Sequence, residues 1–283
     1  MKILKAIGGQ RLVQCLLATA LATTGTPGQA HFQLLYTPET TPTRGIATDW
    51  FMLFTHPVHG GPHMDMGAPE KFYVVSQRGD GAEPRTTDLL EYVEPIEFAS
   101  EQGVTQAYSA SLPRSVTRSL GDYIFVLQAA PYYESNEDKY IQQFTRTMVN
   151  VGGVPGNWAE PMGLPAEVLP LNKPYANWQG GVFRGVVLAD GEPVPNAEIE
   201  IEYLNHDPNL ENMTLSEQGN VELPQDSFGT QTIYANAAGE FTIGLPREGW
   251  WGICALAIGA DTEHEGKELS QDAVLWLQVK DLE

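Results

Sequence analysis

The sequence predicts an all-β protein made of two β-sandwich domains of the immunoglobulin or transthyretin-like kind. Three observations lead to this fold class. Helical periodicity is scarce, short stretches of alternating apolar and polar residues recur, and Gly, Pro, Asp and Asn bound those stretches. Turn residues at such regular intervals are typical of sandwich proteins.

Residues 1–30 have the pattern of a secretory leader. A basic start is followed by an apolar stretch over 12–22 and a tail of small residues that ends at Ala30. We expect cleavage after Ala30, which makes His31 the first residue of the mature chain and places the protein in the periplasm.

Residues 31–149 are predicted to form the first sandwich, which is expected to bind metal. The alternating stretches that predict its strands are 31–36, 50–55, 71–76, 94–99, 107–111, 123–129 and 140–151. Residues 134–143 fit either a strand or a short helix.

Residues 150–181 are predicted to connect the two domains without a regular element of their own. Five prolines and six glycines punctuate this segment, and such residues interrupt both helices and strands.

Residues 182–283 are predicted to form a second, transthyretin-like sandwich. The sequence predicts one hairpin from 182–188 and 197–204, and a second from 231–235 and 240–245. In 197–204, isoleucines and a tyrosine alternate with Glu198, Glu200 and Glu202, which predicts one buried and one solvated face. Two apolar strands at 250–258 and 273–279 complete the domain, and the latter is expected to close a sheet.

The charge excludes several functions. The chain has 36 acidic and 16 basic residues, a net charge of −20. Bulk charge of this sign does not bind nucleic acid or anionic lipid. No apolar run in 31–283 approaches the ~20 residues of a membrane helix, so direct membrane insertion is not expected. Nucleophile-elbow, zinc-protease, phosphate-loop and dinucleotide motifs are absent from the sequence.

Histidines are the strongest functional clue. Four of the six fall within residues 31–63, whereas His206 and His264 are scattered. A terminal His31 offers its α-amine and its imidazole Nδ1 to one metal ion, and together they close a six-membered chelate ring. Imidazole suits nickel, copper, zinc and iron.

The segment 56–66 supplies the other candidate ligands. Pro57 and the Gly60-Gly61-Pro62 run exclude a helix and a central strand in this segment. His56 is therefore expected where a strand ends, with His59 in a loop and His63 opening the next extended piece. Each histidine has a structural alternative, as a hydrogen-bonded or solvated side chain. Met64 is a further candidate ligand, although Met64 and Met66 are most simply core residues and Asp65 a solvated one.

An acidic cluster comprises Glu134, Glu137 and Asp138. These carboxylates fit two interpretations: partners that orient a metal-binding imidazole, or a solvated surface cluster.

Several stretches together resemble the NikK-type periplasmic accessory proteins of energy-coupling-factor nickel transporters. They include Ala30-His31-Phe32-Gln33-Leu34, Phe54-Thr55-His56-Pro57 with Met64-Xaa-Met66 and Pro69, Tyr-Tyr-Glu-Ser-Asn-Glu-Asp-Lys-Tyr-Ile from 132 to 141, Phe183-Arg184-Gly185-Val186-Val187 and Gly249-Trp250-Trp251-Gly252. The second half also resembles the transthyretin-like or carboxypeptidase-regulatory sandwich, a scaffold with many functions.

The resemblance implies that the protein binds Ni²⁺ outside the cytoplasmic membrane and delivers it to a membrane nickel transporter. The nickel-binding role that the resemblance implies is assigned most directly to His31 and His56. An acidic residue expected shortly after Pro57 is replaced by the Val58-His59 pair, which leaves the preferred metal open between Ni²⁺, Cu²⁺ and Co²⁺, and leaves the number of ligands open as well.

Three functions therefore compete. The leading one is a metal-binding protein without catalysis, in which His31 and His56 bind Ni²⁺ and one of His59, His63 or Met64 completes the shell. The second is an oxidative copper enzyme acting on polysaccharide, because a terminal histidine and a second imidazole also form a copper brace. The third is a structural or adhesive sandwich protein whose histidines are incidental.

Overall fold

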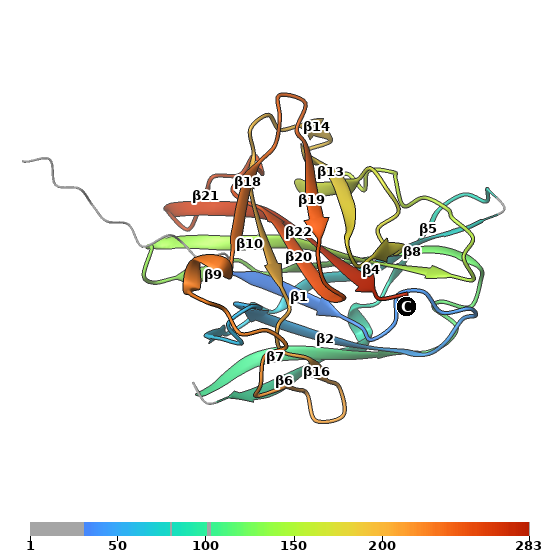
Figure 1. Cartoon of the computed structure of the whole chain (residues 1–283), viewed down its shortest axis with the longest axis horizontal. Coiled ribbons are helices and arrows are strands. Elements are labelled where there is room, and N and C mark those ends of the chain that lie inside the picture. Colours follow the sequence, from blue (N-terminus) through green and yellow to red (C-terminus); the bar gives the residue numbers. More distant parts are fainter. Residues whose placement is uncertain (1–30, 80, 101–102, 283) are drawn as a thin grey trace, which may run out of the picture.

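Three β-sheets stack as layers in the computed structural model, which describes residues 31–79, 81–100 and 103–282 (Figure 1). The all-β prediction is confirmed: among the described residues, the helical pieces are the two 3₁₀ turns η1 (Leu90–Tyr92) and η2 (Asp226–Phe228). No helix in this part of the chain has the length and apolarity to cross a membrane. The leader predicted at 1–30 lies outside the described residues.

The first sheet contains the strands that carry the histidine segment. Its order is β1 (Phe32–Tyr36), β2 (Thr48–Thr55), β7 (Gly103–Leu112) and β6 (Val93–Ser100), with the short β3 (His63–Met64) paired to the end of β2. Each longer strand of this sheet coincides with a predicted one.

The central sheet contains strands from both halves of the chain. Its order is β18 (Gln231–Tyr234), β15 (Glu198–Tyr203), β20 (Gly249–Ala255), β22 (Lys267–Lys280), β10 (Lys139–Val151), β8 (Gly121–Ala129), β4 (Pro69–Arg78) and β5 (Arg85–Asp88). Three short strands extend it: β9 (Tyr132–Glu134), β12 (Asn177–Trp178) and β21 (Glu263–His264). The segment 134–143, left open between strand and helix, forms the β9–β10 hairpin.

The third sheet consists of β11 (Ala166–Pro170), β13 (Gly181–Ala189), β14 (Glu192–Pro193) and β19 (Glu240–Leu245). A separate two-stranded ribbon, β16 (Pro208–Asn209) with β17 (Thr214–Leu215), lies beside β6 near the first sheet (Figure 1).

The central sheet is buried on both faces, because the other two sheets cover it. On β8, Phe125 and Leu127 pack with Trp50 of the first sheet, whereas Ile124 and Val126 pack in the cluster that contains the third sheet. Successive side chains of a strand point to opposite faces, so both sets must be apolar here. The strands β10 and β22 are accordingly buried along most of their length.

A parallel pair joins the two halves of the chain. Strand β10 runs beside β22 from Tyr140 opposite Leu269 to Thr147 opposite Trp276. β22 therefore lies in the middle of its sheet, and the expectation that 273–279 would close a sheet is wrong. The division into domains at 149 and 182 stays a prediction.

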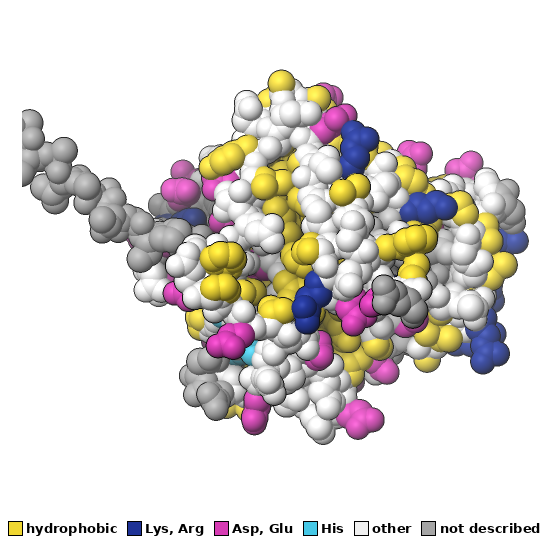
Figure 2. Space-filling view, in the orientation of Figure 1, with side chains coloured by type: hydrophobic (Ala, Val, Ile, Leu, Met, Phe, Trp, Pro, Cys, Tyr) yellow, Lys and Arg dark blue, Asp and Glu magenta, His cyan; other side chains and the backbone are white. Residues whose placement is uncertain are grey.

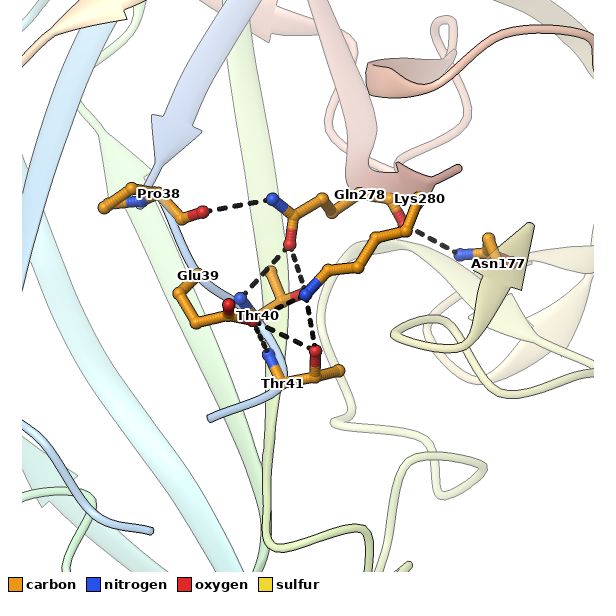
Figure 3. A network of polar contacts seen from close by, with 7 residues as sticks. All are labelled: Pro38, Glu39, Thr40, Thr41, Asn177, Gln278 and Lys280. Atoms are coloured by element: carbon orange, nitrogen blue, oxygen red, sulfur yellow. Dashed lines mark hydrogen bonds and ion pairs between the residues drawn. The ribbon is translucent and has the colours of Figure 1, made fainter. Parts of the chain in front are cut away.

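Polar contacts fasten the same two halves at the end of β22 (Figure 3). The ammonium of Lys280 lies 2.8 Å from Oε1 of Glu39 and donates to the Thr41 hydroxyl at 2.7 Å. Gln278 accepts a hydrogen bond from the Thr40 hydroxyl and donates one to the Pro38 carbonyl. The loop after β1 is thus held by a strand about 240 residues later.

Neither predicted hairpin of the second half forms. β13 pairs with β11, β14 and β19, whereas β15 pairs with β18 and β20 in another sheet. The turn at Asp190-Gly191 pairs the short β14 with β13 in the same sheet. The connections from β14 to β15 and from β18 to β19 then carry the chain from one sheet to another. Turn composition is the same for both kinds of connection, so the sequence pattern did not separate them.

Two further expectations need correction. The connecting segment 150–181 was expected to lack regular elements, but it contains β11 and β12. Its prolines do not prevent this, because they fall beside or at the end of short edge strands, where proline is tolerated. The glutamates of β15 do not form a solvated face: Glu198 is exposed, but Glu200 is 5% exposed and Glu202 is fully buried. Glu202 is contacted by Val58 in the loop after β2 and by Thr230.

Candidate metal centre

His31 and His56 lie side by side. The register of β1 and β2 places Phe32 opposite Thr55, so the residue before β1 meets the residue after β2. The two imidazole ring centres are 4.6 Å apart. His56 is buried. The two residues singled out most strongly by the sequence are therefore brought together.

Glu134 is the acidic partner of His31. It ends β9, its side chain is buried, and its Oε2 lies 3.2 Å from Nε2 of His31. The backbone N–H of Asn136 donates to the other carboxylate oxygen at 2.9 Å, which fixes the carboxylate. Glu137 and Asp138 instead form ion pairs with Lys139 and Lys267. Of the three carboxylates in the acidic cluster, one faces the site and two are surface charges.

The position of His31 is held through its main chain. Gln143 of β10 donates from its side-chain amide to the His31 carbonyl and accepts the Gln33 backbone N–H at 2.6 Å. Burial lowers the pKa of the His31 imidazole, and the charges of Glu134 and Glu137 oppose that shift. The imidazole is therefore neutral at pH 7, the form that binds metal.

Two aromatic rings lie near the His31 imidazole. The Phe54 ring lies 5.5 Å and the Tyr132 ring 6.3 Å from the His31 ring, centre to centre. A cavity of about 10 Å³ next to them is lined by Phe54, Met66, Tyr132 and Gln143 among others. Met64, the predicted ligand, is buried in the core cluster with Phe54 and Met66, and Met66 is the methionine that lines the cavity.

The loop after His56 is clamped by the second half of the chain. The N–H of Val58 donates to Oε2 of Glu202 at 3.2 Å, and the Thr230 hydroxyl donates to Oε1 at 2.6 Å. Asn205 donates its backbone N–H to the Pro57 carbonyl at 3.2 Å and its side-chain amide to the Val58 carbonyl at 3.0 Å. The position of His56 thus depends on residues more than 140 positions away, which no local pattern predicts.

Glu202 should make stability depend on pH. Burial raises its pKa to about 7, against two opposing hydrogen bonds, from a reference value of 4.5. Between these pH values the unfolded chain releases the proton and the folded chain keeps it, so the free energy of unfolding falls as pH rises, by about 3 kcal/mol at most.

We expect Glu202→Gln to remove this dependence while it retains an oxygen acceptor for Val58. Urea unfolding at pH 4.5 and pH 7.5 measures it, with Glu137→Gln, a change in a surface ion pair, as the matched control. An identical change with pH in wild type and Glu202→Gln would contradict the expectation.

His59 and His63 lie away from the His31–His56 pair. Nδ1 of His63 is 2.8 Å from the Thr55 hydroxyl, and its ring packs edge-on against Phe98 at 4.7 Å. Thr55 and Phe54 are adjacent in β2 and point to opposite faces, so His63 lies on the face opposite the one that meets His31. His59 and His63 line a different cavity, together with His206.

Within the described residues, no group of three or more His, Cys, Asp or Glu side chains is arranged to hold a metal ion. The site offers two imidazoles, with a carboxylate on the far nitrogen of one of them. A mononuclear centre here needs at least one donor from outside that set of side chains.

Comparison with known proteins gives one family and several distant structural likenesses. The sequence matches the family described as Domain of unknown function (DUF4198) over residues 28–259. No curated protein matches the chain. The D0-D1 domain of intimin is 11% identical with a TM-score of 0.21, and the match covers 88% of this chain and 100% of that one.

The Yersinia pseudotuberculosis adhesin InvE is 12% identical with a TM-score of 0.23, over 89% of this chain and 61% of InvE. Native Escherichia coli α2-macroglobulin is 10% identical with a TM-score of 0.20, over 89% of this chain and 14% of that protein. Likenesses this remote carry no argument about function. The family match spans most of the sequence, and the chain therefore belongs to the DUF4198 family.

Proposed function

We propose that this protein binds Ni²⁺ outside the cytoplasmic membrane and passes it to a membrane nickel transporter, as the resemblance to NikK-type accessory proteins implies. The ligands are the α-amine and Nδ1 of His31 and the imidazole of His56. The protein acts as a metal carrier and not as an enzyme. Cu²⁺ and Co²⁺ fit the same donors.

One observation carries the proposal: Glu134 contacts Nε2 of His31. A carboxylate on Nε2 stabilises the tautomer with the proton on that nitrogen, so the lone pair lies on Nδ1. Nδ1 is the nitrogen that can close a chelate ring with the main-chain nitrogen of the same residue. A carboxylate, an imidazole and a metal in line are the usual arrangement around a ligating histidine.

Processing supplies the missing donor. Cleavage after Ala30 converts the His31 peptide nitrogen into an amine, which brings the nitrogen donors to three with the two imidazoles. Mass spectrometry of the exported protein is expected to show His31 as the first residue. The remaining coordination positions go to water, because His59 and His63 line another cavity. A shell completed by water also lets a transporter take the metal by ligand exchange.

Titration with several metals tests the proposal. We expect the processed protein to bind Ni²⁺ tightly at pH 8 and much more weakly at pH 5, because protons compete for imidazole and amine nitrogen. Ca²⁺ and Mg²⁺, which prefer oxygen donors, should bind poorly at both values. Tight Ca²⁺ binding, or Ni²⁺ binding indifferent to pH, would contradict the proposal. Copper-dependent consumption of peroxide in the same preparation would favour the oxidative enzyme instead.

Removal of the Glu134 carboxylate should weaken the site. We expect Glu134→Ala to lower Ni²⁺ affinity by about 10- to 100-fold, the usual cost of losing a partner of a ligating histidine. Glu134→Gln keeps an oxygen acceptor for Nε2 and should lose less. The matched control is Glu137→Ala, three residues away and paired to Lys139, which should bind as wild type does. Equal Ni²⁺ affinities for Glu134→Ala and Glu137→Ala would contradict the claim that Glu134 fixes the His31 tautomer that binds metal.

A further inference from the structure

The outer edge of β1 is held by side chains of the central sheet. In the described part of the chain, β1 is the end strand of the first sheet, paired with β2 on one side only. It also lies against β10 and β22 (Figure 1). Three of its alternate carbonyl groups accept a hydrogen bond from side chains of those two strands: His31 from Gln143, Gln33 from the Trp276 indole at 2.9 Å, and Leu35 from the Thr147 hydroxyl at 2.6 Å. His31 is therefore the first member of a regular series of contacts.

Gln143 makes the first contact of that series with its side-chain amide in one defined orientation. The His31 carbonyl only accepts hydrogen bonds and the Gln33 backbone N–H only donates, so the amide nitrogen faces His31 and the amide oxygen faces Gln33. The same amide nitrogen donates to Oδ2 of Asp272 at 3.3 Å. Because the Gln143 side chain is buried, water does not compete strongly for these groups, and the two main-chain contacts hold the start of β1 in place.

His31 is held at both of its ends. Glu134 contacts Nε2 at the tip of the imidazole, and Gln143 binds the carbonyl oxygen. The α-carbon lies between these two anchors, and the main-chain nitrogen is bonded directly to that carbon. The His31 side chain is only 12% exposed, and histidine forms very little of the surface on the face that Figure 2 shows. After cleavage, the α-amine therefore starts from a fixed carbon and has few directions open to it.

We propose that Gln143 is a positioning residue for the nickel site: it places the α-amine of His31 where that amine and Nδ1 close the chelate ring on one metal ion. Because Gln143 acts on the donors of that site, this role rests on the proposed function. The first residue of a chain is usually poorly ordered, and ordering a backbone residue costs conformational entropy. Gln143 orders His31 when the protein folds, so metal binding does not have to, and the affinity is higher.

The test compares Gln143→Met in two forms of the protein, one that begins at His31 and one that retains Ala30. Methionine is about as long as glutamine but forms neither of the two main-chain hydrogen bonds. In the form that begins at His31, Ni²⁺ affinity measured by calorimetry at pH 8 should fall by about 10-fold. In the form that retains Ala30, the amine is already displaced, so the same substitution should have a much smaller effect on affinity.

The matched control is Gln142→Met. Gln142 precedes Gln143 in β10 and is also buried, but its side chain points to the opposite face, where it bonds to Gln271 at 3.1 Å and to the Ala129 carbonyl at 3.3 Å. It should leave Ni²⁺ affinity unchanged in both forms. Hydrogen exchange in the metal-free protein gives an independent readout: the Gln33 backbone N–H loses its acceptor in Gln143→Met and should exchange faster, but not in Gln142→Met.

A second variant covers the case in which Gln143→Met does not fold, which urea unfolding curves reveal. Gln143→Asn keeps the amide on a side chain one methylene shorter, and it should lose affinity in the same form-dependent way. Equal losses in the two forms would mean a general structural role and would overturn the proposal, as would no loss in the form that begins at His31. Failure of the unsubstituted protein that begins at His31 to bind Ni²⁺ would instead contradict the proposed function, and this role with it.

Discussion

We expect His56→Ala to weaken Ni²⁺ binding of the processed protein by more than 100-fold. His56 is a buried side chain held by the clamp that Glu202 and Asn205 form on the following loop. Its removal takes away a ligand that the fold has already positioned. The loss in Ni²⁺ affinity should therefore exceed the ~10- to 100-fold typical of residues that hydrogen-bond to a metal ligand. His31→Ala should lose a similar amount, because it keeps the amine but opens the chelate ring.

Isothermal titration with Ni²⁺ at pH 8 measures both variants. The control is His264→Ala, which lies on β21 and contacts Tyr140, and which should bind as wild type does. Equal losses in His31→Ala, His56→Ala and His264→Ala would mean that imidazoles bind the metal without a defined site. Unfolding curves for each variant separate loss of a ligand from loss of the fold.

The second large effect concerns stability. Arg146 of β10 and Glu167 of β11 form an ion pair with an N–O distance of 2.6 Å, and both side chains are at most 1% exposed. Glu167 also accepts the backbone N–H of Met162. Arg146→Met leaves the carboxylate buried without its cation, so we expect a loss of about 3–5 kcal/mol in the free energy of unfolding.

The double variant Arg146→Met with Glu167→Leu removes both charges. It should recover most of that loss, because a buried ion pair can be replaced by apolar groups at little cost. Arg184→Met breaks the exposed pair with Glu240, 3.5 Å apart, and should change stability by less than about 1 kcal/mol. Urea unfolding measures all three. If the double variant is less stable than Arg146→Met, the attraction within the ion pair stabilises the fold by more than the burial of its two charges destabilises it.

The sequence predicts the strands better than their partners. Alternation and turn residues located β2, β8 and β10, because these depend on local chain properties. Pairing depends on which sheet a strand enters, and the turns between β13 and β15 and between β18 and β19 carry the chain from one sheet to another. The buried glutamates of β15 were missed for the same reason, since alternation indicates two different faces but not what covers them.

Part of the site was predictable in the same way. His31 precedes β1 and His56 follows β2, and these two strands are antiparallel neighbours. The proximity of the two histidines can therefore be predicted once the two strands are paired. Glu134 is predictable only as one of three carboxylates, because its orientation depends on the β9–β10 hairpin. His206 lies 147 positions after His59 in the sequence, and nothing local places it at Gly60. The clamp on Val58 is likewise a product of long-range packing.

The parallel pair of β10 and β22 has a consequence for how the chain reaches its native state. Residues 139–151 obtain one of their two neighbours only from residues 267–280, so the first half cannot complete its core until the second half has been synthesised. Contacts of such long sequence separation slow folding. The layers should accordingly form together in one late step, and His31 and His56 should reach their positions only then.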